Sequence, residues 1–317
     1  MTLRSELTSV INGFIRKFER FKRFKMDENS LFHGLSFLCA ASSIIAILFI
    51  TVFVGMEGLK TFFEVSLDNL LSVRWAPYYG SYGIIPLIVG SLTVVAGALL
   101  ISVPLGISSA VFITQFIPKN VHDIVKAIIE ILAAIPSVVY GFIGLIFISP
   151  YLISLLNVPT GKIALNGMII LSLMVIPTIT SISSEIMSSV PKDYIEASLA
   201  LGATKWQTIR GVILPTSMPG MIASIILAFG RAIGETVAVL IVCGSVAKIP
   251  VGNIFLNPVY PLTAAIAMYM GEAVVGSTFY HVLYTLGLFL FIITFAATTL
   301  ADFIIAKYTK ALRRIVI

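Results

Sequence analysis

An arginine and a glutamate lie four residues apart in the otherwise apolar stretch "AFGRAIGETVAVL", residues 228–240. A charge at the centre of a bilayer costs roughly 2.5–3.5 kcal/mol on insertion scales, so charges inside a membrane span are functional candidates by default. The planar guanidinium of Arg231 can bind two oxygens of an oxyanion at once. Residues four apart share one face of a helix, so Arg231 and Glu235 can also meet. The stretch allows two interpretations. Arg231 and Glu235 are either functional residues on a substrate pathway or at its gate, or a static ion pair that fixes the register of the helix.

In the first interpretation, Glu235 holds Arg231 as an ion pair while the site is empty and limits how tightly an anion is held afterwards. Gly230, Gly234 and Ala238 form a line of small residues beside the charges. Such a line lets helices pack closely. We therefore expect this segment to be a helix at an interface, with its charges turned inward.

The composition indicates that these charges lie within membrane-spanning segments. The chain has 317 residues, of which 58% are hydrophobic and 11% charged, and its mean hydropathy is +1.03. Soluble domains carry about 25% charged residues. A polytopic membrane protein is therefore predicted, with an all-α fold of six transmembrane helices. The expected spans are residues 34–56, 84–113, 131–156, 165–184, 213–245 and 274–301.

Basic residues are distributed unevenly between the segments that join these spans. With the N-terminus inside, sixteen of the 21 Lys and Arg residues fall in inner segments, four fall in outer segments, and Arg231 lies within a span. Cytoplasmic loops carry the excess of Lys and Arg. Both termini are therefore predicted to face the cytoplasm. The first span is expected to be a retained anchor.

The leader, residues 1–30, has its own pattern. Apolar residues recur every three or four positions, and basic residues fill the opposite face; the apolar residues are Leu3, Leu7, Val10, Phe14, Phe18 and Phe21. A basic amphipathic helix on an anionic cytoplasmic leaflet is one interpretation, and docking on a partner subunit is the other. Residues 31–317 are expected to form one transmembrane domain.

A polar cytoplasmic loop, "SSVPKDYIEASLALGATKWQTIRGVILPTSMPG", occupies residues 188–220. Its pattern predicts two short helices joined at Gly202, because glycine allows a turn that bulkier residues disfavour. An ordinary amphipathic loop would also fit these residues. The segment "EASLALGATKWQTIRGVILP", however, resembles the coupling loop of ABC importer permeases. The matching residues are Glu196, Ala197, Gly202, Leu214 and Pro215, while Ser198 and Val212 are mild departures from the pattern.

Four further segments, "YGIIPLIVGSL", "SVPLGISSAVF", "EILAAIPSVVYGFIGL" and "GRAIGETVAVL", resemble the phosphate-specific ABC transporter permeases, the C-type more closely than the A-type. The resemblance implies a type I ABC importer permease fold in a bacterial or archaeal cytoplasmic membrane. It implies phosphate import, with Arg231 and Glu235 as transport residues. The implied partners are a second, A-type permease, two cytoplasmic ATPase subunits that hydrolyse ATP, and an extracytoplasmic phosphate-binding protein.

Other functions are less well supported by the residues. The closest approach to a P-loop, "PTGKIA", lacks the first glycine and the Ser/Thr, so this chain is expected to bind no ATP and to be no enzyme. The histidines are scattered, and no metal site or other cofactor is expected. Another oxyanion such as sulfate or molybdate remains an alternative cargo, and a secondary transporter or channel is a further alternative.

Three polar residues are secondary candidates for the pathway. Glu130 lies where the third span is expected to open, as an interface carboxylate or a pathway residue. Ser137 and Tyr140, just beyond Pro136, offer hydroxyl groups to a polar path, although such groups also bond to the backbone.

Overall fold

The computed structural model describes residues 30–249 and 252–315. The amphipathic helix predicted for residues 1–30 therefore lies outside the described residues, apart from its last residue. The described chain is mainly helical, with one antiparallel hairpin of β1 (Trp75–Ala76) and β2 (Ser81–Tyr82). Gly80 closes this hairpin with φ +71°, a left-handed conformation that glycine adopts without strain.

Six helical segments of the described residues are long and apolar enough to span a membrane, which confirms the predicted number. Their bounds differ from the predicted ones mainly where prolines or glycines interrupt a helix. The segments are Gly34–Glu64, Ile85–Gln115, Ser137–Leu156, Ala164–Ser188, Lys205–Ile233 and Thr278–Ala306.

The chain divides into two compact units at residues 53 and 54. The described part of the first unit is the beginning of helix α2 (Ser30–Glu64). Leu38, Ile44 and Phe49 on this helix are exposed. Such a surface suits a span in contact with lipid, because apolar side chains are at home in hydrocarbon.

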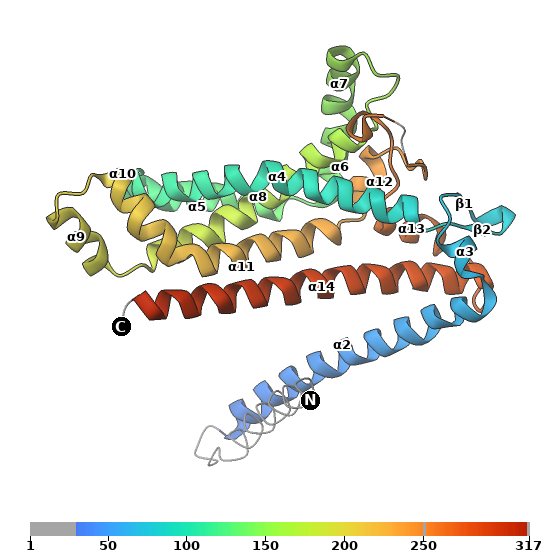
Figure 1. The fold of residues 1–317 in the computed structure, drawn as a ribbon, viewed down its shortest axis with the longest axis horizontal. Helices are drawn as coiled ribbons and strands as arrows, with labels where there is room; N and C mark the ends of the chain where they lie inside the picture. Colours follow the sequence, from blue (N-terminus) through green and yellow to red (C-terminus); the bar gives the residue numbers. More distant parts are fainter. Residues whose placement is uncertain (1–29, 250–251, 316–317) are drawn as a thin grey trace. The chain divides into compact units, whose positions relative to one another are not determined.

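The second unit is built around α4 (Ile85–Gln115) and α8 (Ala164–Ser188), which have the most extensive contact of any two helices among the described residues. Small residues on α4 allow this approach: a Cβ at Gly97 would lie 2.4 Å from Met168 Sδ, and one at Gly106 would lie 2.7 Å from Ile179. Helix α11 (Leu214–Ile233) packs on α8, and α14 (Thr278–Ile315) packs on α11. The axes of these helices are roughly aligned, and α11 runs opposite to α4, α8 and α14 (Figure 1).

The third predicted span is not one helix. Helix α5 (Lys119–Ala134) ends at Ile135, whose extended backbone is typical of the residue before a proline. After Pro136 the chain continues as α6 (Ser137–Ile143), a π-helical turn η2 (Gly144–Ile148) and α7 (Ser149–Leu156). The apolar span therefore begins at residue 137 rather than at the predicted residue 131.

The fifth predicted span is interrupted as well. It begins with α10 (Lys205–Thr208) and the π-helical turn η3 (Ile209–Ile213), continues as α11, and breaks at Gly234 before α12 (Val237–Val242). Each π-helical turn precedes a proline, Pro150 or Pro215, near the start of the next helix. A proline cannot donate the regular helical hydrogen bond, which favours a local irregularity of this kind.

Short elements complete the described chain. They are α3 (Leu67–Leu70), η1 (Pro77–Tyr79), α9 (Lys192–Ala200), η4 (Ile254–Leu256) and α13 (Leu262–Tyr269).

Candidate functional site

Arg231 lies in the last turn of α11, and its half-buried side chain joins three helices. Nη1 donates a hydrogen bond to the Thr178 hydroxyl of α8 at 3.1 Å. Nη2 donates a second one to the Ala133 carbonyl of α5, also at 3.1 Å. This carbonyl is among the last of its helix, where no intrahelical donor is available. The two terminal nitrogens of the guanidinium, which we call the Arg231 fork, therefore each donate a hydrogen bond to an oxygen of the protein.

Glu235 faces a different set of groups. Its Oε1 accepts the backbone N–H groups of Thr236, Val237 and Ala238 at 3.1, 3.1 and 3.2 Å. The Glu235 carbonyl accepts the Thr263 hydroxyl at 2.6 Å. A carboxylate at this position satisfies the free donors at the start of α12 and is favoured by the helix dipole.

The predicted ion pair between Arg231 and Glu235 is therefore wrong for this conformation. The prediction assumed one continuous helix, whereas α11 ends at Ile233 and Glu235 belongs to the break before α12. The two side chains consequently point to different helices, Arg231 to α5 and α8 and Glu235 to α12.

The expected packing of small residues is correct only in part. A Cβ added at Gly230 would meet no atom of the described residues within 4 Å, so no described helix of this chain packs closely there. Ala238 is buried, and a Cβ added at Gly141 would lie 3.3 Å from its Cα. The close helix contact is thus made by α12 with α6 rather than by the end of α11.

A small pocket lies beside Glu235. Its lining is mostly apolar and comes from α4, α8, α11, α12 and α13 together with the segments just before α12 and α13; it includes Ser91, Val94, Leu171, Val239 and Thr263. Glu235 and the hydroxyl groups of Ser91 and Thr263 are its polar members. In the part of the chain that the structure describes, no group of three or more His, Cys, Asp or Glu side chains could hold a metal ion.

The secondary candidates occupy different environments. Glu130 is exposed within α5 and does not open a span, because the membrane segment starts beyond Pro136. Ser137 is half-buried at the first position of α6. The Tyr140 hydroxyl donates to the Leu132 carbonyl at 2.9 Å, which is the backbone-bonded alternative. The structure therefore groups Tyr140 with the end of α5, near the acceptor of Arg231.

The predicted coupling residues fall into two sets. Residues 188–215 form a knob. Glu196, Ala197 and Gly202 are exposed on it, in α9 and the following turn, whereas Leu214 and Pro215 are half-buried at its end, where η3 joins α11. Figure 1 shows the knob projecting beyond the ends of α4, α8 and α11.

Local contacts make the knob a defined structure. Gly202 has φ +85°, the left-handed conformation that ends α9. Thr204 and Gln207 form a reciprocal capping box at the start of α10. The hydroxyl groups of Ser198 and Thr208 hydrogen-bond at 3.0 Å between the two helices. The exposed side chains of Leu201 and Trp206 give the knob an apolar surface.

Sequence reasoning missed Thr178, Ala133 and Thr263. Thr178 precedes Arg231 by 53 residues, and Ala133 takes part through its backbone. No local pattern marks such residues, because an interior threonine in a membrane helix usually bonds its own backbone.

The fold and the exposed knob define a class of protein. The chain has the fold of the type I ABC importer permeases, which known structures share at low sequence identity. A chain of the crystal structure of a bacterial alginate ABC transporter aligns with 93% of this chain and 99% of its own, with a TM-score of 0.63 at 15% identity. A chain of the MetNI methionine ABC transporter, in an inward-facing conformation, aligns with 74% of this chain and 99% of its own, with a TM-score of 0.54 at 19% identity.

Sequence comparison places the chain within this class. Residues 102–314 match the family model of the binding-protein-dependent transport system inner membrane component, and the chain belongs to that family. The probable ABC transporter permease protein YqgH of Bacillus subtilis is 40% identical over 262 residues, 81% of this chain and 84% of the relative. The phosphate transport system permease protein PstC of Haemophilus influenzae is 34% identical and covers 88% of this chain and 91% of the relative. PstC of Mesorhizobium japonicum is 32% identical, with coverage of 90% and 92%.

Proposed function

We propose that this chain is a transmembrane permease subunit of an ATP-driven importer of inorganic phosphate. The observation that carries the proposal is the Arg231 fork, held between Thr178 and the Ala133 carbonyl. Both acceptors are oxygens, and a phosphate ion offers oxygens of the same kind with a full negative charge. The names of the PstC relatives supply the choice of phosphate.

In this mechanism phosphate replaces protein acceptors of Arg231. A guanidinium binds a tetrahedral oxyanion through two parallel hydrogen bonds, and charged acceptors bind more strongly than a neutral carbonyl. Exchange of the Ala133 carbonyl for phosphate frees the end of α5 at the Ile135–Pro136 break. Glu235 acts beside this site by accepting the backbone N–H groups at the start of α12. The empty site needs no ion pair between Arg231 and Glu235, because the neutral oxygens of Thr178 and Ala133 satisfy the guanidinium.

The knob at residues 188–215 is the element proposed to couple transport to ATP hydrolysis. Glu196, Ala197 and Gly202 present a surface for a cytoplasmic ATPase subunit, and Leu214 and Pro215 join that surface to α11. A rigid displacement of the knob is therefore carried toward Arg231 at the other end of the same helix. This chain hydrolyses no ATP itself and binds no cofactor in this scheme.

The arrangement in the membrane follows from the distribution of charge. Both termini and the knob face the cytoplasm, since the basic residues concentrate in those segments. A second, A-type permease completes the path, two ATPase subunits lie beneath it, and an extracytoplasmic binding protein delivers phosphate to the opposite face.

The experiment is phosphate uptake by vesicles that contain the whole complex with Arg231→Lys. A lysine keeps the charge but has no planar fork, so we expect uptake to fall at least about tenfold, equivalent to about 1.4 kcal/mol of lost transition-state stabilisation. Arg74→Lys, at an exposed arginine outside the spans, is the matched control and should leave uptake unchanged. Near-normal uptake by a normally assembled Arg231→Lys complex would refute the role of the fork.

The cargo is tested in the same vesicles. Excess unlabelled phosphate should compete with labelled phosphate, whereas sulfate and molybdate should not. Preferential competition by sulfate or molybdate would keep the class of transporter and change its substrate. Flux through this chain without ATP and without partners would support a channel or secondary transporter instead.

A further inference from the structure

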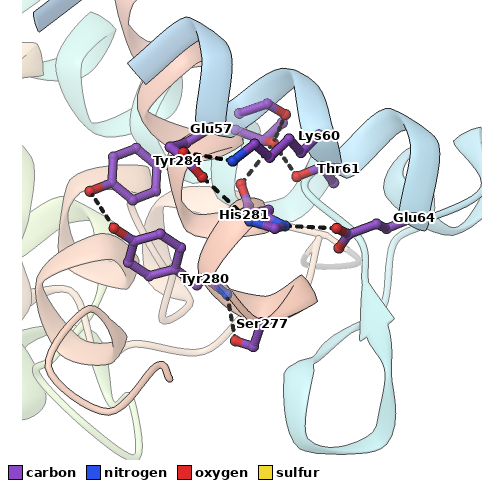
Figure 2. Close-up of polar contacts among 10 residues, drawn as sticks. Glu57, Lys60, Thr61, Glu64, Ser277, Tyr280, His281 and Tyr284 are labelled. Carbon is purple, nitrogen blue, oxygen red and sulfur yellow. Dashed lines mark hydrogen bonds and ion pairs between the residues drawn. The ribbon is translucent and has the colours of Figure 1, made fainter. Parts of the chain in front are cut away.

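A buried histidine outside the Arg231 site lies between two carboxylates. His281, in the first turns of α14, is 5% exposed. Its Nδ1 is 2.9 Å from Glu64 Oε1, a hydrogen-bond distance, and its Nε2 is 3.4 Å from Glu57 Oε2, close enough for charge attraction. Both glutamates belong to α2 and lie seven residues apart, two helical turns, so they share the face that meets the ring (Figure 2).

The surroundings hold this arrangement tightly. The Thr285 hydroxyl, one turn after His281, lies 2.8 Å from both the Gly58 carbonyl and the Thr61 hydroxyl. Gly58 permits the approach, because a Cβ there would lie 3.1 Å from the Tyr284 carbonyl. Residues 54–64 of α2 and the first turns of α14 therefore meet through a small polar cluster rather than through apolar side chains alone.

The charges in the cluster do not balance with a neutral ring. From α2, Lys60 Nζ lies 2.7 Å from Glu57 Oε1, so one ammonium faces two carboxylates. From α14, the hydroxyl groups of Tyr280 and Tyr284 bond to each other at 3.0 Å, and from β2, Tyr82 interacts electrostatically with Glu64. The three tyrosines are uncharged at neutral pH. One further positive charge makes the set electrically neutral.

The imidazole ring can supply that charge. A neutral ring has one N–H, so one of its nitrogens would present a lone pair to a carboxylate, whereas the doubly protonated ring has a donor for each. We propose that His281, Glu57 and Glu64 form a proton-binding site, and that the bound proton stabilises the contact between residues 54–64 of α2 and the start of α14. This inference rests on the geometry of the cluster and is independent of the transported anion.

The pH dependence has a definite direction. Both carboxylates bind the protonated ring. The contact between α2 and α14 is therefore stronger while the ring carries its second proton, and it weakens when the ring loses that proton. The two helix ends should therefore separate more often as the pH rises.

The test is hydrogen–deuterium exchange of the full chain in lipid nanodiscs at about pH 6 and about pH 8, the range in which histidine titrates. After correction for the intrinsic pH dependence of exchange, residues 54–64 and 278–286 of the wild type should exchange roughly tenfold more slowly at the lower pH, as expected for a hydrogen bond to a charged group. His281→Gln should abolish the difference. His122→Gln is the matched control, because His122 lies on α5 and contacts the exposed Asp123.

Two further variants test the same site if His281→Gln does not fold. Glu64→Gln and Glu57→Gln retain the ring but each removes one of its anionic partners, so each should reduce the pH difference. The proposal is overturned if the wild type shows no pH difference in these segments. It is also overturned if the difference persists unchanged in His281→Gln, or in both glutamate variants when His281→Gln cannot be prepared.

Discussion

The guanidinium of Arg231 and the hydroxyl of Thr178 lie 3.1 Å apart, linking the end of α11 to the middle of α8. Because α8 also makes the main contact with α4, this hydrogen bond ties a charged side chain to the most extensively packed pair of helices. The other branch of the fork reaches the end of α5, beside a proline break. Arg231 thus joins an acceptor within a closely packed helix to an acceptor just before a proline break.

We expect Thr178→Val to weaken transport, because valine has a similar shape but no acceptor for Arg231 Nη1. Loss of one such bond costs about 1 kcal/mol, which corresponds to a several-fold loss of uptake in the assembled complex. Thr178→Ser retains the hydroxyl and should preserve uptake. Equal uptake by the valine and serine variants would show that Thr178 does not position the guanidinium.

Substitutions at Glu235 should separate its capping role from its charge. Glu235→Ala removes the oxygen that accepts three backbone N–H groups and should cost about 1 kcal/mol of stability. Glu235→Gln keeps an acceptor oxygen, so its unfolding temperature should lie between those of the wild type and the alanine variant. Thermal unfolding of the purified complex measures both. An alanine variant as stable as the wild type would contradict the assigned cap.

Gly202 and Gly211 provide a matched pair for the coupling knob. An added Cβ has open space at both, but Gly202 has φ +85° whereas Gly211 lies in the π-helical turn. Gly202→Ala should cost about 1 kcal/mol through backbone strain and shift the turn after α9. We expect it to reduce recovery of the ATPase subunit with the tagged chain, while Gly211→Ala leaves recovery unchanged. The opposite ranking would exclude Gly202 as the residue that shapes the docking surface.

Tyr78 provides a pH-dependent contact outside the spans. The hydrogen bond that its hydroxyl donates to Glu272 is the main cause that raises the pKa of Tyr78 above the ordinary value. The protonated phenol is the bonded form, so this contribution to stability is present below about pH 10 and is lost as the pH rises through the raised pKa.

Phenolate absorbance during an alkaline titration measures this effect. Glu272→Gln should move the ionisation of Tyr78 to lower pH, and subtraction of the Tyr78→Phe titration identifies that tyrosine among the 11 in the chain. An unchanged ionisation in Glu272→Gln would show that the carboxylate does not cause the shift.

Local properties of the sequence determined the class of this protein. Six apolar stretches predict six spans because a helix needs about 20 apolar residues to cross a bilayer, whatever it packs against. The coupling loop was recognisable from Glu196 to Pro215 because its residues are contiguous and its glycine marks a turn. The third span, expected as one helix at residues 131–156, is divided at Pro136, because the residue before a proline favours an extended backbone.

Only the tertiary structure decided the partners of the charged residues. Arg231 and Glu235 are neighbours in the sequence, but the break after Ile233 turns one side chain toward Thr178 and Ala133 and the other toward the start of α12. His281 likewise meets Glu57 and Glu64, more than 200 residues away in the sequence, through contact between two helices. Hydrophobicity acts on each segment separately, whereas a hydrogen bond depends on the positions of two atoms, which packing of the whole chain sets.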